Sequence, residues 1–376
     1  MKKDLSSLEI HYLVKELNKS GITESKINRI FQPEEKTVLL DLFASGKGKI
    51  LLKIMTPNFM FISSEKGENP QNPFNFCMVL RKYITNARVD KIEQVGSERI
   101  VKFSIRTKEK NFHLYVELFS KGNIVLCDDK DMIISAIEKQ IWKTRSVKKD
   151  EAYIVPSRGY NFFTLNEDEL KDVVEKTTKD HLIAILAMDL GIGGTYSEEI
   201  CTISGLNKNL ETGKIDVVKI RKIIEAIKDV TSRKMKPFVI KRDDNTIDAI
   251  PFELELYKYY DKEEKETFSS AIDAFVSTSF DKTAIHKRSK YEDKIKELER
   301  LIAKQEEQLK RIEEEQDENR KKGELMYEQY QLINEILVEI RKAREKYSWK
   351  EIKEKLKGHK IIKDINEKEG KITAEI

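Results

Sequence analysis

Residues 37–63 read TVLLDLFASGKGKILLKIMTPNFMFIS, and the fold class is clearest in this stretch. Three short apolar runs, at 37–43, 50–55 and 58–63, are separated by turn-forming residues: Gly46, Gly48 and Pro57. Short apolar runs bounded by glycine and proline are typical of β strands. We therefore predict three short strands, one after the other, in this part of the chain.

The flanking residues extend the pattern in both directions. Upstream, Ser6 or Ser7 can cap a helix, and Glu9 stands three residues after Ser6, as a capping box requires. Downstream, the sequence predicts a helix followed by further strand-like runs: a helix at 74–84 and strands at 100–105, 112–119, 124–127 and 132–137. Many short strands with two helices favour an α+β fold in which helices pack at the ends of a β-sandwich. We assign this domain to residues 1–165.

Beyond this domain the apolar residues recur with a helical period. Two short helical segments flank the turn at residues 191–194, Gly-Ile-Gly-Gly, and this arrangement resembles a helix–hairpin–helix. We therefore predict a helix–hairpin–helix domain at 166–235. Residues 236–280 regain strand character, end in an amphipathic helix, and are expected to complete the globular part.

Heptads dominate residues 281–347, where apolar side chains alternate by three and four. This stretch carries 17 basic and 17 acidic residues, so it is neutral. The heptad phase breaks near Asn319 and Gly323, and we predict that a new helix begins there. We expect a coiled coil with a middle helical element, pairing within one chain or between two. Residues 348–376 are predicted to begin a truncated C-terminal part, with its opening strand at 371–376.

Composition narrows the class of function. The 376 residues include 70 basic and 66 acidic side chains, a net charge of +4 with no polybasic tail. Any nucleic-acid surface must therefore be assembled by folding from scattered lysines and arginines. We expect a cytoplasmic protein with no membrane association, because no apolar run is long enough to span a bilayer and no secretory signal opens the chain. Three cysteines are too few for a disulfide scaffold or a cysteine zinc site: Cys77, Cys127 and Cys201.

Five blocks of residues stand in order along the chain: SLEI (7–10) with LVKEL (13–17), PFNFCMVLRKY (73–83), Gln94 with ERIV (98–101), LGIGGTYSEEIC (190–201) and KGELMY (322–327). In this order they resemble the NFACT family, whose members include eukaryotic NEMF and bacterial RqcH, also called fibronectin-binding protein A. The resemblance spans almost the whole chain and is of the archaeal type.

The resemblance implies an architecture and a function. The family has an N-terminal domain like that of formamidopyrimidine-DNA glycosylases, a helix–hairpin–helix domain, a coiled coil and a C-terminal RNA-binding domain, for which this chain leaves no room. Members bind large ribosomal subunits blocked by peptidyl-tRNA, hold tRNA, and direct mRNA-independent C-terminal tailing of the nascent chain. The ribosome makes the peptide bond, so the resemblance implies a binding protein with no cofactor rather than an enzyme.

The resemblance also assigns a tRNA-handling site to Glu9, Glu98 and Arg99. The family has aspartate at both acidic positions, so each carboxylate here stands one methylene further out. An arginine can pair with phosphate or stack on a base. A carboxylate can accept from a base amino group or a ribose hydroxyl, or can simply orient the arginine. The alternative interpretation is that Glu9 only caps the first helix, and that Glu98 and Arg99 form a surface ion pair.

Two further groups are candidates for RNA contact. Arg81 and Lys82, in the helix predicted at 74–84, could meet RNA phosphate or could simply form its solvated face. The turn glycines Gly191, Gly193 and Gly194 would let backbone amides approach a phosphate at the following helix. Their alternative role is a tight turn that needs positive φ.

Other functions are weaker on this sequence. The five histidines are far apart and lack metal-ligand spacing, so we expect no metal site. A DNA-glycosylase-like DNA-binding protein is the main alternative, but such enzymes use an N-terminal proline amine, and here Lys2 follows Met1. A cell-surface matrix-binding protein would need a signal or an anchor, which the sequence does not show.

Overall fold

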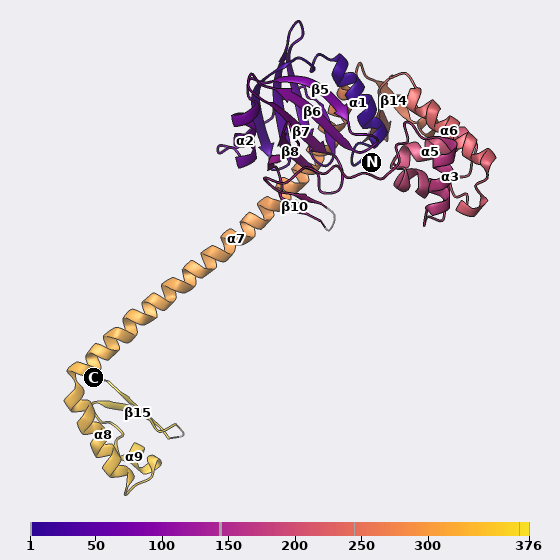
Figure 1. The fold of residues 1–376 in the computed structure, drawn as a ribbon. Coiled ribbons are helices and arrows are strands. Elements are labelled where there is room, and N and C mark those ends of the chain that lie inside the picture. Colours follow the sequence, from indigo (N-terminus) through magenta and orange to yellow (C-terminus); the bar gives the residue numbers. More distant parts are fainter. Residues whose placement is uncertain (1, 143–144, 244, 368, 376) are drawn as a thin grey trace. The chain divides into compact units, whose positions relative to one another are not determined.

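The computed structural model describes residues 2–142, 145–243, 245–367 and 369–375, and describes their side chains except at 279–296. The chain divides into two compact units, Met1–Ala284 and Ile285–Ile376 (Figure 1). Each unit has a hydrophobic core of its own. None of the helices within the described residues is both long enough and apolar enough to cross a membrane.

Nine antiparallel strands form the main sheet of the first unit, in the order β4-β3-β2-β1-β5-β6-β7-β8-β9. Figure 1 shows β5 to β8 side by side. All seven strands predicted between residues 37 and 137 are present, with small shifts at their ends. The strands are β1 (Lys26–Glu34), β2 (Thr37–Ala44), β3 (Gly48–Met55), β4 (Phe59–Ile62), β5 (Arg88–Gln94), β6 (Ile100–Arg106), β7 (Asn111–Glu117), β8 (Asn123–Asp128) and β9 (Ile133–Ala136).

The shortest strand pairing in the sheet is between β1 and β5, whose ladder consists of the single pair Lys26 and Arg88. The sequence predicted a β-sandwich, which has two sheets, whereas hydrogen bonding here joins all nine strands into one. Close to this pair the register is irregular in β1 against β2 and in β5 against β6, as at β-bulges, which locally increase the twist of a strand. The side chains of both halves nevertheless pack into one core, among them Leu40 of β2 and Phe103 of β6.

The sequence pattern did not predict β1 or β5. A strand with one exposed face is recognised by the alternation of buried and exposed residues, and a bulge shifts that alternation by one residue. In β5 the buried residues Val89 and Ile92 are therefore three positions apart. Pro33 near the end of β1 obscures that strand further.

Two helices accompany this sheet, as predicted. α1 (Ser7–Lys19) is held against β5 by the Asn18 amide, which donates to the carbonyl of Ile92 at 2.9 Å. α2 (Asn75–Ile84) carries the chain from β4 to β5 and buries one apolar face against the sheet. Both therefore extend the core of the nine strands.

Residues 167–232 are mainly helical, with helices on each side of the glycine turn as expected. That these helices form a helix–hairpin–helix remains a prediction. The elements are α3 (Glu167–Lys176), α4 (Leu182–Ala184), the π-helical turn η1 (Ile185–Asp189), α5 (Gly194–Ser204), the short 3-10 turn η2 (Thr212–Lys214) and α6 (Val217–Ser232).

Smaller strands complete the first unit. β12 (Phe238–Arg242) lies between β13 (Asn245–Ile250) and β14 (Asp261–Glu264), and the 3-10 turn η3 (Glu255–Tyr257) connects β13 to β14. A short pair, β10 (Gln140–Ile141) and β11 (Ser146–Val147), stands apart from the main sheet.

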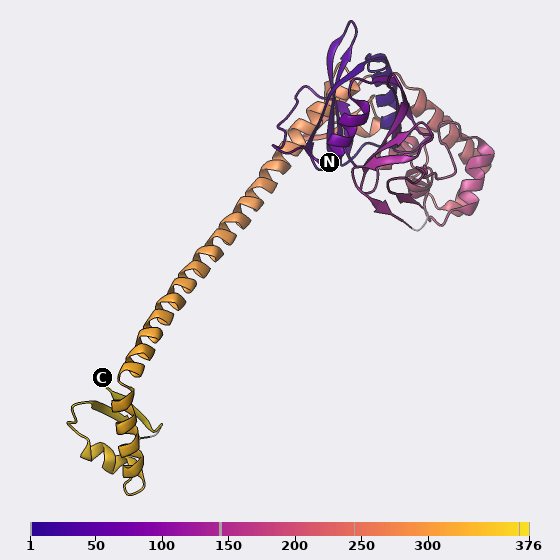
Figure 2. The same cartoon turned by 60° about the vertical axis from the view of Figure 1, so that its left-hand side comes forward.

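One hydrophobic core runs through the sheet, the helical segment and these smaller strands. Tyr12 of α1 packs on Phe252 with ring centroids 5.0 Å apart, and its hydroxyl donates to the carbonyl of Val230 in α6. Figure 2 shows the magenta and pink helical segment beside the indigo and purple strands. The ranges 1–165, 166–235 and 236–280 therefore share one core, and their division into domains remains a prediction.

The long helix α7 (Phe268–Glu328) contradicts the predicted break near Asn319 and Gly323. An interior glycine costs only about 1 kcal/mol of helix stability. One i,i+4 ion pair spans this glycine, from Arg320 to Glu324, and another, from Glu318 to Lys322, directly precedes it; such pairs support a helix. The interruption lies instead at Gln329, after which α8 (Tyr330–Arg344) begins.

The C-terminal unit ends in a helix and a hairpin. α9 (Trp349–Lys355) follows α8, and β15 (Ile362–Asn366) pairs antiparallel with β16 (Lys371–Ala374). The sequence predicted that residues 371–376 open a new strand system, but β16 completes this hairpin. The hairpin forms because Ile362 and Ile365 pack on Ile340 and Ile352 from the two helices.

Candidate functional site

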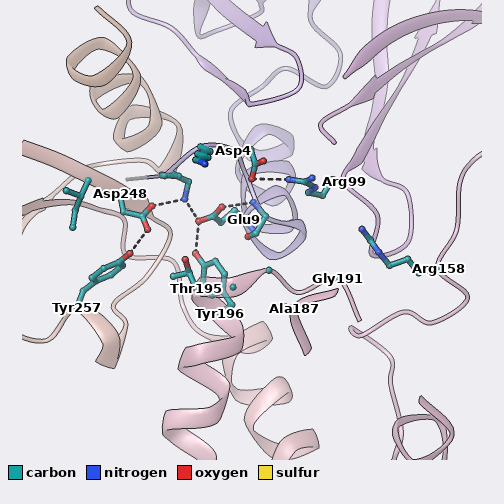
Figure 3. Close-up of a pocket in the computed structure, with 16 residues that line it drawn as sticks. Asp4, Glu9, Arg99, Arg158, Ala187, Gly191, Thr195, Tyr196, Asp248 and Tyr257 are labelled. Carbon is teal, nitrogen blue, oxygen red and sulfur yellow. Dashed lines mark hydrogen bonds and ion pairs between the residues drawn. The ribbon is translucent and has the colours of Figure 1, made fainter. Parts of the chain in front are cut away.

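A pocket of about 510 Å³ lies within the first unit, where the N-terminal residues meet the glycine turn (Figure 3). Four parts of the chain build it: residues 2–9, the loops that carry Arg99 and Arg158, the start of α5, and β13 with η3. Most of its lining is charged or polar: Lys2, Lys3, Asp4, Ser6, Glu9, Arg99, Arg158, Ala187, Gly191, Gly193, Gly194, Thr195, Tyr196, Ile247, Asp248 and Tyr257.

Glu9 is the buried centre of this pocket and is only 2% exposed. Its side chain completes the predicted capping box: it accepts from the backbone N–H of Ser6 at 2.8 Å, while the Ser6 hydroxyl accepts from the N–H of Glu9. Its other oxygen accepts from the Lys2 ammonium and, at 2.9 Å, from the Tyr196 hydroxyl. Burial, assisted by the charge of Asp248, raises the pKa of Glu9, and Lys2 opposes that rise.

Lys2 joins the N-terminal segment to β13. Its ammonium, which is 6% exposed, donates to Glu9, to Asp248 at 2.8 Å and to the carbonyl of Ala249 at 2.9 Å. Burial alone would lower the pKa of Lys2, but Asp248 and Glu9 outweigh it and raise that pKa to about 12. One protonated lysine is therefore shared by two buried carboxylates.

Two tyrosines complete this buried network. Tyr257 donates to Asp248 at 2.7 Å, and Tyr196 donates to Glu9. Burial and the nearby carboxylates raise the pKa of both hydroxyls, so both stay protonated at neutral pH. Lys2 is the only cation among the five described side chains of this network, and it pairs with both Glu9 and Asp248.

The arginines lie on the other side of Glu9, as Figure 3 shows. Arg99 pairs with Asp4 at 3.0 Å and also donates to the carbonyl of Leu5 at 3.3 Å. Arg158 pairs with Glu98 at 2.7 Å, and its backbone N–H donates to the same carboxylate. The alternative interpretation, that Glu98 and Arg99 form an ion pair with each other, is therefore wrong: these adjacent residues have different partners.

The glycine turn forms one wall. Gly191 has φ +71° and Gly193 has φ +94°, so both occupy conformations that favour glycine. A Cβ atom on Gly191 would lie 2.6 Å from the Arg158 guanidinium, so that arginine packs directly on the turn. Gly194 begins α5, where the capping residue Gly193 supplies no side-chain acceptor. The predicted tight turn is confirmed, and it faces the pocket.

Arg81 and Lys82 lie elsewhere, on α2. Arg81 donates through Nε to the carbonyl of Ile30 in β1 at 2.9 Å, and the Lys82 ammonium lies over the ring of Tyr83. Neither lines the pocket. The pocket thus contains Glu9, Arg99 and the three glycines. Glu98 does not line it but pairs with Arg158, which does. The two α2 residues lie outside it.

Sequence reasoning missed Lys2, Arg158 and Asp248 as site residues. One signal was available, because Asp248 is an acidic residue inside a predicted strand, where aspartate is uncommon. The other two carried no local signal, since a lysine near a terminus and an arginine in a loop are usually solvated. Among the described residues, no group of three histidine, cysteine or acidic side chains could hold a metal ion. The three cysteines are buried thiols.

Comparison with known proteins places these features in a family. Residues 6–369 match the family described as "NFACT N-terminal and middle domains". The archaeal Rqc2 homolog aRqcH of Methanocaldococcus jannaschii is 30% identical over 392 residues, covering 99% of this chain and 58% of that relative. Ribosome quality control complex subunit NEMF of Homo sapiens is 25% identical, covering 94% of this chain and 35% of NEMF. The chain therefore spans less than two thirds of the length of these relatives.

Solved structures show the same fold. The N-terminal part of the fibronectin/fibrinogen-binding protein from Streptococcus suis aligns with a TM-score of 0.58 at 19% identity, covering 73% of this chain and 99% of that one. The fibrinogen binding protein from Staphylococcus aureus aligns with a TM-score of 0.59 at 17% identity, over 72% and 98%. With a match over residues 6–369 and an archaeal relative at 30% identity, the chain belongs to the NFACT family.

Proposed function

We propose that this chain acts in ribosome-associated quality control, where it binds tRNA and stalled large ribosomal subunits and supports mRNA-independent C-terminal tailing of nascent chains. The match of residues 6–369 to the family carries this proposal. The names of the archaeal and human relatives support it. Because the chain covers 58% of the archaeal relative, the proposal concerns the part played by the N-terminal and middle domains.

The pocket is the proposed contact with tRNA. It brings Glu9 and Arg99, to which the resemblance assigns tRNA handling, to one site with the glycine turn. Arg99 and Arg158 each use part of their donor set on one carboxylate, which leaves further N–H groups for phosphate oxygens. Arg81 and Lys82 on α2 would form a second, separate contact with RNA phosphate.

The proposed role is binding and positioning, with no bond-making by the protein itself. A lysine nucleophile needs a depressed pKa, whereas Asp248 and Glu9 raise the pKa of Lys2 to about 12. A protonated, triply hydrogen-bonded ammonium cannot attack a substrate. The ammonium in the pocket therefore supports a structural role for Lys2 and disfavours glycosylase-like amine chemistry.

A gel mobility-shift measurement tests this proposal: the purified chain is mixed with deacylated tRNA at increasing salt concentrations. We expect binding that weakens with salt, and about tenfold weaker binding for the double variant Glu98→Ala, Arg99→Ala, because hydrogen bonds to charged groups are each worth about 1.5–3 kcal/mol. The control is Lys91→Ala, Glu93→Ala, which removes an exposed ion pair from β5 without changing the net charge. No tRNA binding in dilute buffer, or equal loss in both double variants, would contradict the proposal.

A further inference from the structure

Positive charge is concentrated in the C-terminal unit. Residues 341–363, which include the end of α8, all of α9 and the start of β15, contain ten basic residues and only three acidic ones. Two of these lysines have carboxylate partners: Lys353 pairs with Asp364 at 2.9 Å, and Lys363 pairs with Glu375 at 2.8 Å. The described acidic side chains therefore neutralise only part of the charge.

An aliphatic groove opens within this basic region. It has a volume of about 240 Å³ and is formed by α8, α9 and β15, which Figure 1 shows together at the C-terminal end of the chain. Three of its residues also belong to the small core of the unit, so that core reaches the surface here. The aliphatic residues that line the groove are Ile336, Ile340, Ala343, Ile352, Leu356 and Ile362.

Polar groups at the edge of the groove favour an anionic ligand. The Lys355 ammonium lies over the ring of Tyr347, 3.4 Å from its centroid, and also lines the groove. His359 Nδ1 accepts from two backbone N–H groups at 3.3 Å each, which leaves its Nε2–H as a donor. Among the described lining residues, only Glu339 carries a carboxylate. A carboxylate of a ligand is therefore favoured beside the aliphatic floor.

A second hollow, of about 370 Å³, extends the groove on the side of the hairpin. The two hollows share Leu356 and Ile362. Within the described part of the unit, Lys350 and Lys357 have no carboxylate partner. A ligand that follows the groove past Leu356 thus meets further positive charge. The lysines that line this second hollow are Lys350, Lys353, Lys357 and Lys363.

This combination suits a peptide better than RNA. Single-stranded RNA binds where bases can stack on aromatic side chains. Here the floor is aliphatic, and the nearby rings already carry cations: Lys355 over Tyr347, and Arg344 over Trp349 at 4.6 Å. A volume of about 240 Å³ is also below the roughly 300–1,000 Å³ of small-molecule sites, so it fits a few side chains rather than a whole cofactor.

We propose that the groove formed by α8 and α9 binds an acidic peptide segment of a partner protein. The large apolar side chains of that segment would occupy the aliphatic floor, and its carboxylates would pair with Lys355, Lys350 and Lys357. Apolar anchors in a groove supply affinity, and complementary charges around them supply specificity. The inference goes beyond the proposed function, because it concerns a protein partner and needs no RNA.

Selection from a random peptide library tests the chemistry of the occupant. Phage that display random peptides of about 16 residues would be selected on the immobilised full chain. We expect the enriched peptides to be acidic, with a net charge of about −3 or below, and to contain two or more large apolar residues. Enrichment of basic or purely polar peptides, or no enrichment, would overturn the inference.

Variants locate the binding, measured by fluorescence anisotropy of the most enriched peptide on the full chain. Ala343→Leu fills the groove and should weaken binding about tenfold, whereas Ala374→Leu, on exposed β16, should not change it. Lys355→Glu should weaken binding about fivefold, because it turns an attractive pair into a repulsive one. Lys342→Glu makes the same change on α8 outside both hollows and should cost less than about twofold.

Equal weakening by Lys355→Glu and Lys342→Glu, together with no effect of Ala343→Leu, would show general attraction to positive charge and would overturn the inference. The same variants would be tested with an RNA duplex of about 20 base pairs and with vesicles of phosphatidylserine and phosphatidylcholine. If Ala343→Leu weakened binding to either of these and left the peptide bound, the groove would belong to that ligand and the inference would fail. Failure of the chain to bind tRNA would contradict the proposed function alone.

Discussion

Glu9 serves the fold and the site at the same time. One carboxylate oxygen closes the capping box of α1, and the other receives Lys2 and Tyr196. Capping, one of the two roles that the sequence offered for Glu9, is confirmed, and the same residue also lines the pocket, so capping does not exclude the proposed tRNA contact. Because Glu9 is 2% exposed, it holds the buried side of the pocket together more than it offers surface to a ligand. Its removal would disturb three parts of the chain together.

His11 gives stability a dependence on pH. Its ring stacks on Phe163 at 4.3 Å, and burial, with the charge of Lys15, lowers its pKa to about 4. The folded chain therefore binds this proton more weakly than the unfolded chain. The stability that follows is complete above the ordinary pKa of about 6.5 and is lost as the pH falls from there towards 4.

We expect His11→Phe, which keeps the stack, to flatten this part of the pH profile. The difference in the free energy of unfolding between pH 7.5 and pH 4.5 should shrink by on the order of 1–2 kcal/mol, a figure already reduced for the partial exposure of the ring. Urea unfolding at both values measures it, with exposed His181→Gln as the control. An unchanged difference in His11→Phe would show that other groups cause the dependence.

Single residues were predictable where their role is local. The Ser6–Glu9 capping box and the positive φ at Gly191 follow from neighbours in the sequence, and both are confirmed. Lys2 and Asp248 are 246 positions apart and meet only because β13 packs beside the N-terminal segment. No local pattern encodes such a pair, so this side of the pocket could not be predicted from the sequence.

At the scale of elements, strands were predictable where apolar residues alternate or run without interruption between turn residues. β3 and β6 alternate, and β2 is buried at all but one position, whereas bulges conceal β1 and β5. The heptad phase was a poor guide to the end of α7, because a phase change in apolar residues does not break the backbone hydrogen bonds of a helix. Periodicity reports which face is buried, and it locates a helix end only when a capping residue agrees with it.

Glu16 connects two of these elements and provides the next prediction. Its carboxylate accepts from the backbone N–H groups of Phe268 at 2.6 Å and Ser269 at 2.9 Å, and so caps α7 from α1. Glu16→Ala should lower the free energy of unfolding by about 1–2 kcal/mol, as for lost helix caps. Glu16→Gln, which keeps an acceptor oxygen, should cost less.

Urea unfolding of the variants checks this cap, with Glu175→Ala on the exposed face of α3 as the control. That residue forms only a surface ion pair with Lys171, at 3.9 Å, so its loss should change stability by less than about 0.5 kcal/mol. If Glu16→Ala behaved like Glu175→Ala, the contact between α1 and the start of α7 would be energetically neutral.

At the scale of the whole molecule, the described part of α7 presents an apolar stripe that no described residue covers. Leu298, Ile302, Leu309 and Ile312 are each 48–58% exposed, at the heptad spacing predicted from the sequence. Burying a large aliphatic side chain is worth roughly 1.5–3 kcal/mol. The coiled-coil prediction therefore needs a partner helix, and a second copy of this chain supplies a matching stripe.

We accordingly expect this chain to self-associate, with a sedimentation coefficient that rises with concentration. Leu309→Glu places a charge in the stripe and should return the chain to a monomer, because a buried unpaired carboxylate costs several kcal/mol. Ala303→Glu adds the same charge outside the stripe and should leave association intact. Both variants introduce one acidic residue into the same helix, so a difference between them isolates burial from net charge. A monomer at all concentrations, or equal dissociation of both variants, would show that the stripe does not join two copies.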